Sequence, residues 1–177
     1  AFDGDTSTYW HTNYTVGEDG KNIIEPCPHT VTVTFPEALE IEGIRYIPRQ
    51  MTEQDRSASG IWKTADFYGS VDGKNYEKIG SSAFDVVSSR NASDVKIKAG
   101  KYKAMRVTVT DSVNGYATAA EIEFLKPDDG KAENDKKDEN KKEALKSIIM
   151  AVDSDTAMIS GKTVKLVASP VIKDGRT

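Results

Sequence analysis

Short stretches in which apolar and polar residues alternate recur over residues 1–127. Residues 30–35 alternate Thr with Val and end on Phe, which is typical of a half-buried strand. Similar patterns predict strands at 41–47, 65–70, 95–98, 105–109 and 122–125. Turn residues separate these segments, and no stretch between them has the periodicity of an amphipathic helix. Short strands without intervening helices predict an all-β domain, an antiparallel jelly-roll β-sandwich.

The composition of the chain changes after Pro127. Residues 131–146 include six Lys and five Asp or Glu, and so few apolar residues that they cannot bury a core. We therefore expect residues 128–147 to form a charged, solvated linker. Residues 148–152 and 163–167 again have strand-like patterns, but two strands are too few to be stable alone. Residues 148–177 are therefore expected to be the truncated start of a second, small β-containing domain.

The charge and the reactive residues exclude several classes of function. The formal net charge is −4, and acidic and basic residues are interspersed, which argues against nucleic acid or an anionic membrane as the partner. No run of apolar residues is long enough for a membrane span. The single cysteine, Cys27, excludes an internal disulfide and a cysteine-based zinc site. With only two histidines, an enzyme would have to depend on carboxylates.

Oxygen-bearing side chains gather near the start of the chain. Asp3 and Asp5 flank Gly4, which allows a tight turn, and Thr8 follows three positions after Asp5. Calcium binds six to eight oxygens from carboxylates, hydroxyls and carbonyls, so this loop is a candidate calcium site. Glu121, at the head of the last predicted strand, could complete it, because the first and last strands of a sandwich commonly lie side by side. The alternative is an Asx-turn with two exposed acids.

Five blocks of residues carry a resemblance to a known family. They are residues 3–14, 28–29, 46–50, 68–76 and 120–122. In this order and spacing they resemble the F5/8 type C (discoidin-like) domain, and in particular the galactose-binding carbohydrate-binding modules of family 32 attached to bacterial glycosidases. The resemblance covers residues 1–126. It implies a jelly-roll β-sandwich whose first strand would precede Ala1.

The resemblance also implies a structural calcium ion and a sugar site. The calcium ligands would be the side chains of Asp3, Asp5, Thr8 and Glu121 and the carbonyl of Ala120. The sugar site would consist of His11, Tyr14, Arg49 and Tyr116.

The chemistry of these residue types suits galactose. An arginine and a neutral imidazole can together read the axial 4-hydroxyl, and a tyrosine ring can pack against the apolar face of the sugar. Each residue taken singly has another interpretation. His11 could be a loop histidine bonded to the backbone, Arg49 could pair with Glu53 or Asp55, and the tyrosines could pack at a rim.

The chain departs from the family pattern in the loop that follows Arg49. The family often places Asn or Glu beside the glycine of this loop, whereas this chain has Ser59-Gly60. Glu53, Asp55 and Ser59 are candidates to replace the missing group.

We expect the two tryptophans to lie in different environments. Trp10 is expected in the core. Trp62 is expected to be either an exposed platform for a ligand or a packing residue at a strand edge.

Residues 148–177 resemble the start of a copper amine oxidase N-terminal-like (stalk) domain, through segments such as Ile159-Ser160-Gly161-Lys162. These stalk domains are non-catalytic, and nothing here implies copper. The two resemblances together imply a monomeric module within a multidomain bacterial protein that is secreted or displayed at the cell surface.

Three functions are in competition. The leading one is non-catalytic binding of glycans with terminal galactose or N-acetylgalactosamine, which would target an attached glycan-degrading enzyme or surface protein. The alternative is a protein- or lipid-binding adhesion domain, which would carry apolar residues at its loop tips.

The third function is that of a glycoside hydrolase, which needs two carboxylates about 5 to 9.5 Å apart across a cleft. The best candidate acids are already assigned to calcium, so the chain is not expected to be an enzyme.

Overall fold

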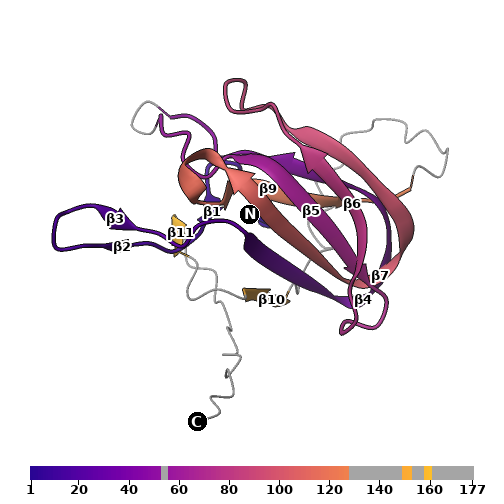
Figure 1. The fold of residues 1–177 in the computed structure, drawn as a ribbon. Coiled ribbons are helices and arrows are strands. Elements are labelled where there is room, and N and C mark those ends of the chain that lie inside the picture. The colour runs from indigo at the N-terminus through magenta and orange to yellow at the C-terminus, as the bar shows by residue number, and fades with distance from the viewer. Residues whose placement is uncertain (53–55, 128–148, 153–157, 161–177) are drawn as a thin grey trace, which may run out of the picture.

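The computed structural model describes residues 1–52, 56–127, 149–152 and 158–160. Apart from one 3-10 turn, η1 (Val113–Gly115), all regular structure in these residues is β-strand. The main sheet has the order β10-β4-β7-β5-β6, and β9 also pairs with β4 (Figure 1). Its strands are β4 (His29–Ile47), β5 (Trp62–Ser70), β6 (Glu77–Ala83), β7 (Ser93–Ser112), β9 (Glu121–Leu125) and β10 (Ile149–Val152).

Two smaller sheets accompany the main one. The first has the order β11-β1-β8 and consists of β1 (Tyr9–His11), β8 (Thr118–Ala119) and β11 (Met158–Ser160). The second is a hairpin of β2 (Thr15–Val16) and β3 (Asn22–Ile23), which projects from the side of the sandwich in Figure 1. The predicted all-β sandwich is confirmed.

The long strands β4 and β7 pair antiparallel along most of their length. Their register shifts between Thr34 and Leu39 and again between Ile41 and Gly43. Such irregularities locally disrupt the hydrogen-bond ladder and bend the strand. The sequence patterns predicted two separate strands where each of β4 and β7 forms. Pro36 lies within the first irregularity, where its missing N–H costs no ladder hydrogen bond.

Alternation along β4 places its apolar side chains in the core. Val31, Val33 and Phe35 are at most 3% exposed. Trp10 is 2% exposed, which confirms its predicted place in the core. Trp62 is completely buried and stacks on Tyr46 with 3.9 Å between ring centroids. The alternative of an exposed Trp62 platform is therefore wrong.

The two described segments after residue 127 pair with the edges of the preceding strands. Strand β10 pairs antiparallel with residues 31–34 of β4, and β11 pairs antiparallel with β1. A strand is therefore present where the pattern at 148–152 predicted one. The charged linker 128–147 and the predicted strand 163–167 lie outside the described residues. The division into residues 1–127, 128–147 and 148–177 stays a prediction.

The described residues contain no helix with the length and apolar character needed to cross a membrane.

We expect Tyr46→Phe to lower the free energy of unfolding by about 1–3 kcal/mol, because it leaves two buried backbone groups without partners. The Tyr46 hydroxyl accepts from Trp62 N (3.2 Å) and donates to the carbonyl of Thr118 (3.1 Å). Urea unfolding measures the change. Tyr68→Phe on β5, where the ring is half-buried, is the control and should cost less than about 0.5 kcal/mol. Equal costs for the two variants would contradict this account.

Candidate functional site

Three of the four predicted sugar-site residues form one group of rings. The His11 ring centroid lies 5.2 Å from that of Tyr116 and 5.7 Å from that of Tyr14. The two tyrosine rings lie 6.0 Å apart and are nearly perpendicular, at 85°. His11 ends β1, Tyr14 precedes β2, and Tyr116 follows η1. We call these three residues the aromatic cluster.

The His11 ring has a defined hydrogen-bonding role. Its Nδ1 contacts the carbonyl oxygen of Thr12, which can only accept, so Nδ1 carries the proton. In the neutral ring, Nε2 is therefore a hydrogen-bond acceptor. Burial lowers the pKa of His11 below its usual 6.5, and the nearby Arg49 cation adds to this against the opposing bond to Thr12. The imidazole is therefore neutral at pH 7.

Arg49 lies beside the aromatic cluster in the segment that follows β4. Only 9% of it is exposed, and its guanidinium carbon lies 4.4 Å from the centroid of the Tyr9 ring, in a cation–π contact. Its charge is close enough to influence the pKa of His11. The alternative ion pairs with Glu53 and Asp55 lie outside the described residues.

Arg90 supports the backbone of this segment. It is 7% exposed, and its guanidinium donates to the carbonyl oxygens of Arg49 (2.9 Å) and Ser57 (3.3 Å). The Gln50 side chain donates to the carbonyl of Arg90 (3.1 Å). Sequence reasoning missed Arg90, because it lies in no motif and its role depends on backbone atoms 33 to 41 positions away.

The loop that carries Tyr116 is held at several points. Thr12 N donates to the carbonyl of Ala117 (2.9 Å), and Ala117 N donates to the Thr12 hydroxyl (3.0 Å). His29 Nε2 bonds to the carbonyl of Gly115 (2.7 Å). The phenol of Tyr116 accepts from the side-chain amide of Asn22 (3.0 Å). These bonds fix the orientation of the Tyr116 ring. The sequence offered no signal for the part of Asn22. His29 lies in one of the five family blocks, but its bond to Gly115 was not predicted.

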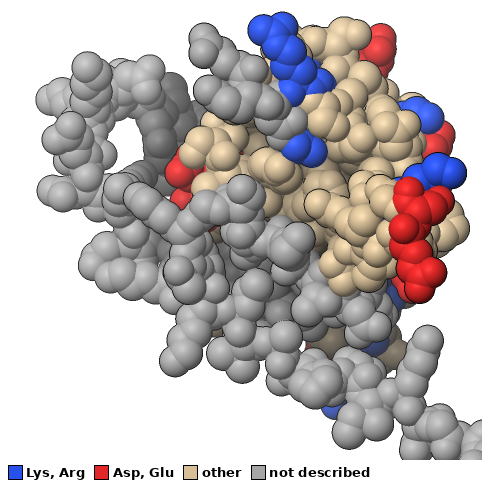
Figure 2. Space-filling model, turned by 90° about the vertical axis from the view of Figure 1, so that its left-hand side faces the viewer, with Lys and Arg blue, Asp and Glu red and all other residues tan. Residues whose placement is uncertain are grey.

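Figure 2 shows the side of the molecule from which the hairpin projects. Most of its described surface is uncharged, and acidic and basic side chains lie mainly at its edges.

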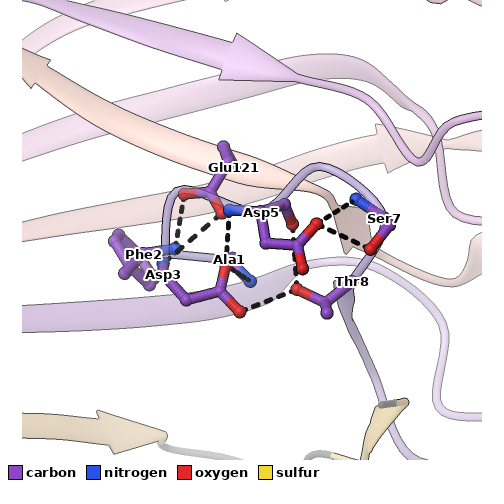
Figure 3. Close-up of polar contacts among 7 residues, drawn as sticks. All are labelled: Ala1, Phe2, Asp3, Asp5, Ser7, Thr8 and Glu121. Atoms are coloured by element: carbon purple, nitrogen blue, oxygen red, sulfur yellow. Dashed lines mark hydrogen bonds and ion pairs between the residues drawn. The ribbon is translucent and has the colours of Figure 1, made fainter. Parts of the chain in front are cut away.

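Three of the five predicted calcium ligands meet at the start of the chain (Figure 3). The Thr8 hydroxyl donates to the Asp3 carboxylate (2.8 Å), and Glu121 accepts from the backbone N–H groups of Phe2 (2.7 Å) and Asp3 (3.4 Å). The Asp5 carboxylate accepts instead from the backbone and hydroxyl of Ser7 (2.9 and 2.6 Å).

The backbone contributes to the same group. The carbonyl oxygen of Asp5 accepts from the Thr8 hydroxyl (3.0 Å). Ala120 is completely buried, and its N–H donates to the carbonyl of Ile47 (2.9 Å). Among the described residues, no group of three His, Cys, Asp or Glu side chains is placed to hold a metal ion. A metal here would depend on hydroxyl and carbonyl oxygens as well as on carboxylates.

Glu121 and Asp3 influence each other's protonation. Glu121 is 3% exposed, and burial, together with a hydrogen bond that its protonated form donates to the Asp3 carboxylate, raises its pKa to about 7. Burial alone would also raise the pKa of Asp3, but hydrogen bonds with Glu121 and Thr8 lower it to about 2. The pair therefore carries less than its full negative charge, and a bound cation would favour the doubly ionised form.

A family model for the F5/8 type C domain matches residues 1–123. The chain belongs to the F5/8 type C domain family. Galactose oxidase of Gibberella zeae is 28% identical over 125 residues, which are 69% of this chain but 17% of the oxidase. The chain therefore spans about one sixth of the length of the curated relatives it matches.

Several solved structures of domains from Clostridium perfringens proteins are similar to this F5/8 type C domain. CBM32-3 from a family 31 glycoside hydrolase has a TM-score of 0.59 and 23% identity, over 70% of this chain and 78% of the other. CpGH89CBM32-5, in complex with GalNAc-β-1,3-galactose, has a TM-score of 0.58 and 25% identity, over the same shares. The CBM32-1 and CBM32-2 domains of ZmpB, in complex with GalNAc, have a TM-score of 0.55 and 25% identity, over 71% of this chain and 30% of theirs.

These comparisons confirm the family resemblance and the β-sandwich. The similar domains are carbohydrate-binding modules. One ZmpB structure contains an M60 catalytic domain in addition to its two CBM32 domains. The prediction that the chain is not an enzyme agrees with its similarity to these modules.

We expect the pKa of His11, measured by NMR titration of its ring protons, to lie below 6.5, because burial favours the neutral ring. Because folding lowers the pKa of His11, the folded state binds a proton at this ring less tightly than the unfolded chain does. Protonation opposes the folded state, so the contribution of His11 to stability is lost as the pH falls through 6.5 and below. A His11→Asn variant assigns the signal. A pKa at or above 6.5 would show that the ring is not buried as described.

Proposed function

We propose that this domain binds glycans with terminal galactose or N-acetylgalactosamine. The observation that carries the proposal is the meeting of a neutral imidazole and two tyrosine rings, from segments more than 100 residues apart, beside the buried cation of Arg49. Two similar structures at 25% identity, CpGH89CBM32-5 and the ZmpB domains, are complexes with GalNAc-β-1,3-galactose and GalNAc. They support the same chemistry for this chain.

The groups of the site complement the hydroxyls of a galactose-type sugar. Arg49 supplies hydrogen-bond donors and His11 Nε2 an acceptor, and together they can read the donor and acceptor character of an axial 4-hydroxyl. The faces of Tyr14 and Tyr116 can pack against the apolar C–H groups of the ring. So few contacts predict weak binding, with a Kd from about 1 mM to tens of micromolar, or about −4 to −6 kcal/mol. Multivalency along a modular chain would raise the effective affinity.

A second candidate function is adhesion to a protein or lipid. It is favoured by two exposed apolar residues on the projecting hairpin, Val16 (63% exposed) and Ile23 (61% exposed). A glycan array without signal, together with binding to a matrix protein or to lipid vesicles, would favour adhesion over sugar binding.

We also propose that a structural calcium ion binds among Asp3, Asp5, Thr8, Ala120 and Glu121. The donor set consists only of oxygens, as calcium prefers. The buried Glu121 carboxyl and the exposed Asp3 carboxylate lie together where a cation would neutralise them. The ion would hold the start of the chain against β9 and would take no part in catalysis.

The wider setting is also a proposal. We infer that the domain is a monomeric module of a multidomain, extracellular or cell-surface bacterial protein. There it would hold an attached glycan-degrading enzyme or surface protein near glycans.

We expect Arg49→Lys and His11→Ala each to weaken galactose binding at least about tenfold. Lysine cannot donate two parallel hydrogen bonds, and alanine removes the imidazole acceptor. Isothermal titration calorimetry measures the affinity. Arg45→Lys on β4, whose guanidinium pairs with Asp94 at the exposed surface, is the matched control and should bind as the wild type does. Galactose binding that is the same in all four proteins would remove the assignment.

We expect calcium chloride to raise the thermal midpoint of the EDTA-treated domain. At free calcium of about 100 times Kd, the added stability is about 2.7 kcal/mol. Glu121→Gln should abolish most of this response, whereas Asp19→Asn, at an exposed acid of the hairpin, should leave it intact. A wild-type midpoint that does not respond to calcium would argue against the ion.

A further inference from the structure

The β2–β3 hairpin lies beside the aromatic cluster and is tied to it. Its turn is closed by hydrogen bonds from Gly17 N to Lys21 O (2.8 Å) and from Gly20 N to Gly17 O (3.0 Å). Gly20 has a positive φ of 75°, which glycine adopts without strain. The bond from Asn22 to the Tyr116 phenol joins the hairpin to the cluster.

The register of the hairpin gives it two distinct faces. Val16 lies opposite Asn22, and Thr15 lies opposite Ile23. Because successive side chains of a strand point to opposite sides, Val16 and Asn22 share the face that meets Tyr116. Thr15 and Ile23 share the other face.

A pocket of about 290 Å³ lies on the Thr15–Ile23 side of the hairpin. The side chains that matter for its chemistry are Thr12, Tyr14, Thr15, Ile23, Glu25 and His29. Tyr14 lines this pocket and also belongs to the aromatic cluster, so the pocket adjoins the proposed sugar site.

The polar groups of the pocket suit a neutral, hydroxyl-rich ligand. His29 Nε2 donates to the carbonyl of Gly115, so in the neutral ring Nδ1 is an acceptor. Glu25 adds a carboxylate acceptor and Thr15 a hydroxyl, while Ile23 adds an apolar wall. In the described part of the chain, no Lys or Arg lines the pocket. Acceptors without a cation favour the O–H donors of a sugar and disfavour anionic groups.

We propose that this pocket is a second saccharide subsite, which takes the neutral sugar unit next to the terminal one. The proposal rests on galactose-type binding at the aromatic cluster and goes beyond it, because the recognised ligand becomes a neutral disaccharide or longer glycan. The volume is at the lower end of small-molecule sites, which limits the occupant to about one sugar unit.

The test compares galactose with neutral disaccharides in which galactose is β-linked 1,3, 1,4 or 1,6 to a second hexose. Calorimetry on the whole chain should show at least one disaccharide bound about tenfold more tightly than galactose. Ile23→Ser should remove this gain and leave galactose binding unchanged. Val16→Ser is the matched control, because Val16 is equally apolar and exposed but lies on the opposite face of the same hairpin. It should keep the gain.

The charge of the pocket gives a second readout. A sulfate on the second hexose should weaken binding of the preferred disaccharide, and Glu25→Gln should recover part of the loss.

The possible outcomes separate the two proposals. If galactose binds but no disaccharide binds more tightly, or if both hairpin variants lose the gain equally, the second subsite is wrong and the proposed function stands. If neither galactose nor any disaccharide binds, the proposed function is wrong and the subsite with it.

Discussion

The candidate site depends on the hydrogen bonds that join the start of the chain to the segment between β7 and β9. Thr12 and Ala117, 105 positions apart, bond to each other twice. Because His11 adjoins the first residue and Tyr116 the second, these bonds bring the rings of the aromatic cluster together. The Glu121 carboxyl also accepts hydrogen bonds from the backbone of Phe2 and Asp3, and these bonds hold the start of the chain against β9. The geometry of the proposed sugar site is thus a consequence of how the sandwich closes.

The sequence predicted the fold well where the information is local. The alternation of residues 30–35 depends only on which side chains face the core, and Val31 and Val33 are buried as expected. The continuity of β4 could not be predicted, because Pro36 has the appearance of a strand end unless the irregular pairing around it is known. The same holds for Trp62, whose stacking on Tyr46 depends on residues 16 positions apart meeting in the core.

Of the candidate site, only the residues that belong to a motif could be predicted from the sequence. His11, Tyr14, Arg49 and Tyr116 follow from the family resemblance, and the structure places the three rings together with the arginine beside them. The supporting residues carry no motif. Arg90 acts on backbone carbonyls and Asn22 on a distant phenol, so both are recognisable only once the chain is folded. The hairpin pocket is likewise a product of tertiary contacts around Tyr14.

The central claim is that one sugar ring is held by side chains from three separate loops. The most direct measurement is NMR chemical-shift mapping of the labelled chain during titration with galactose. The account predicts saturable shifts confined to His11, Tyr14, Arg49, Tyr116 and their immediate neighbours. Glucose, in which the 4-hydroxyl is equatorial, should produce much weaker ones. Shifts that map to another face of the sandwich, or that are the same for both sugars, would contradict it.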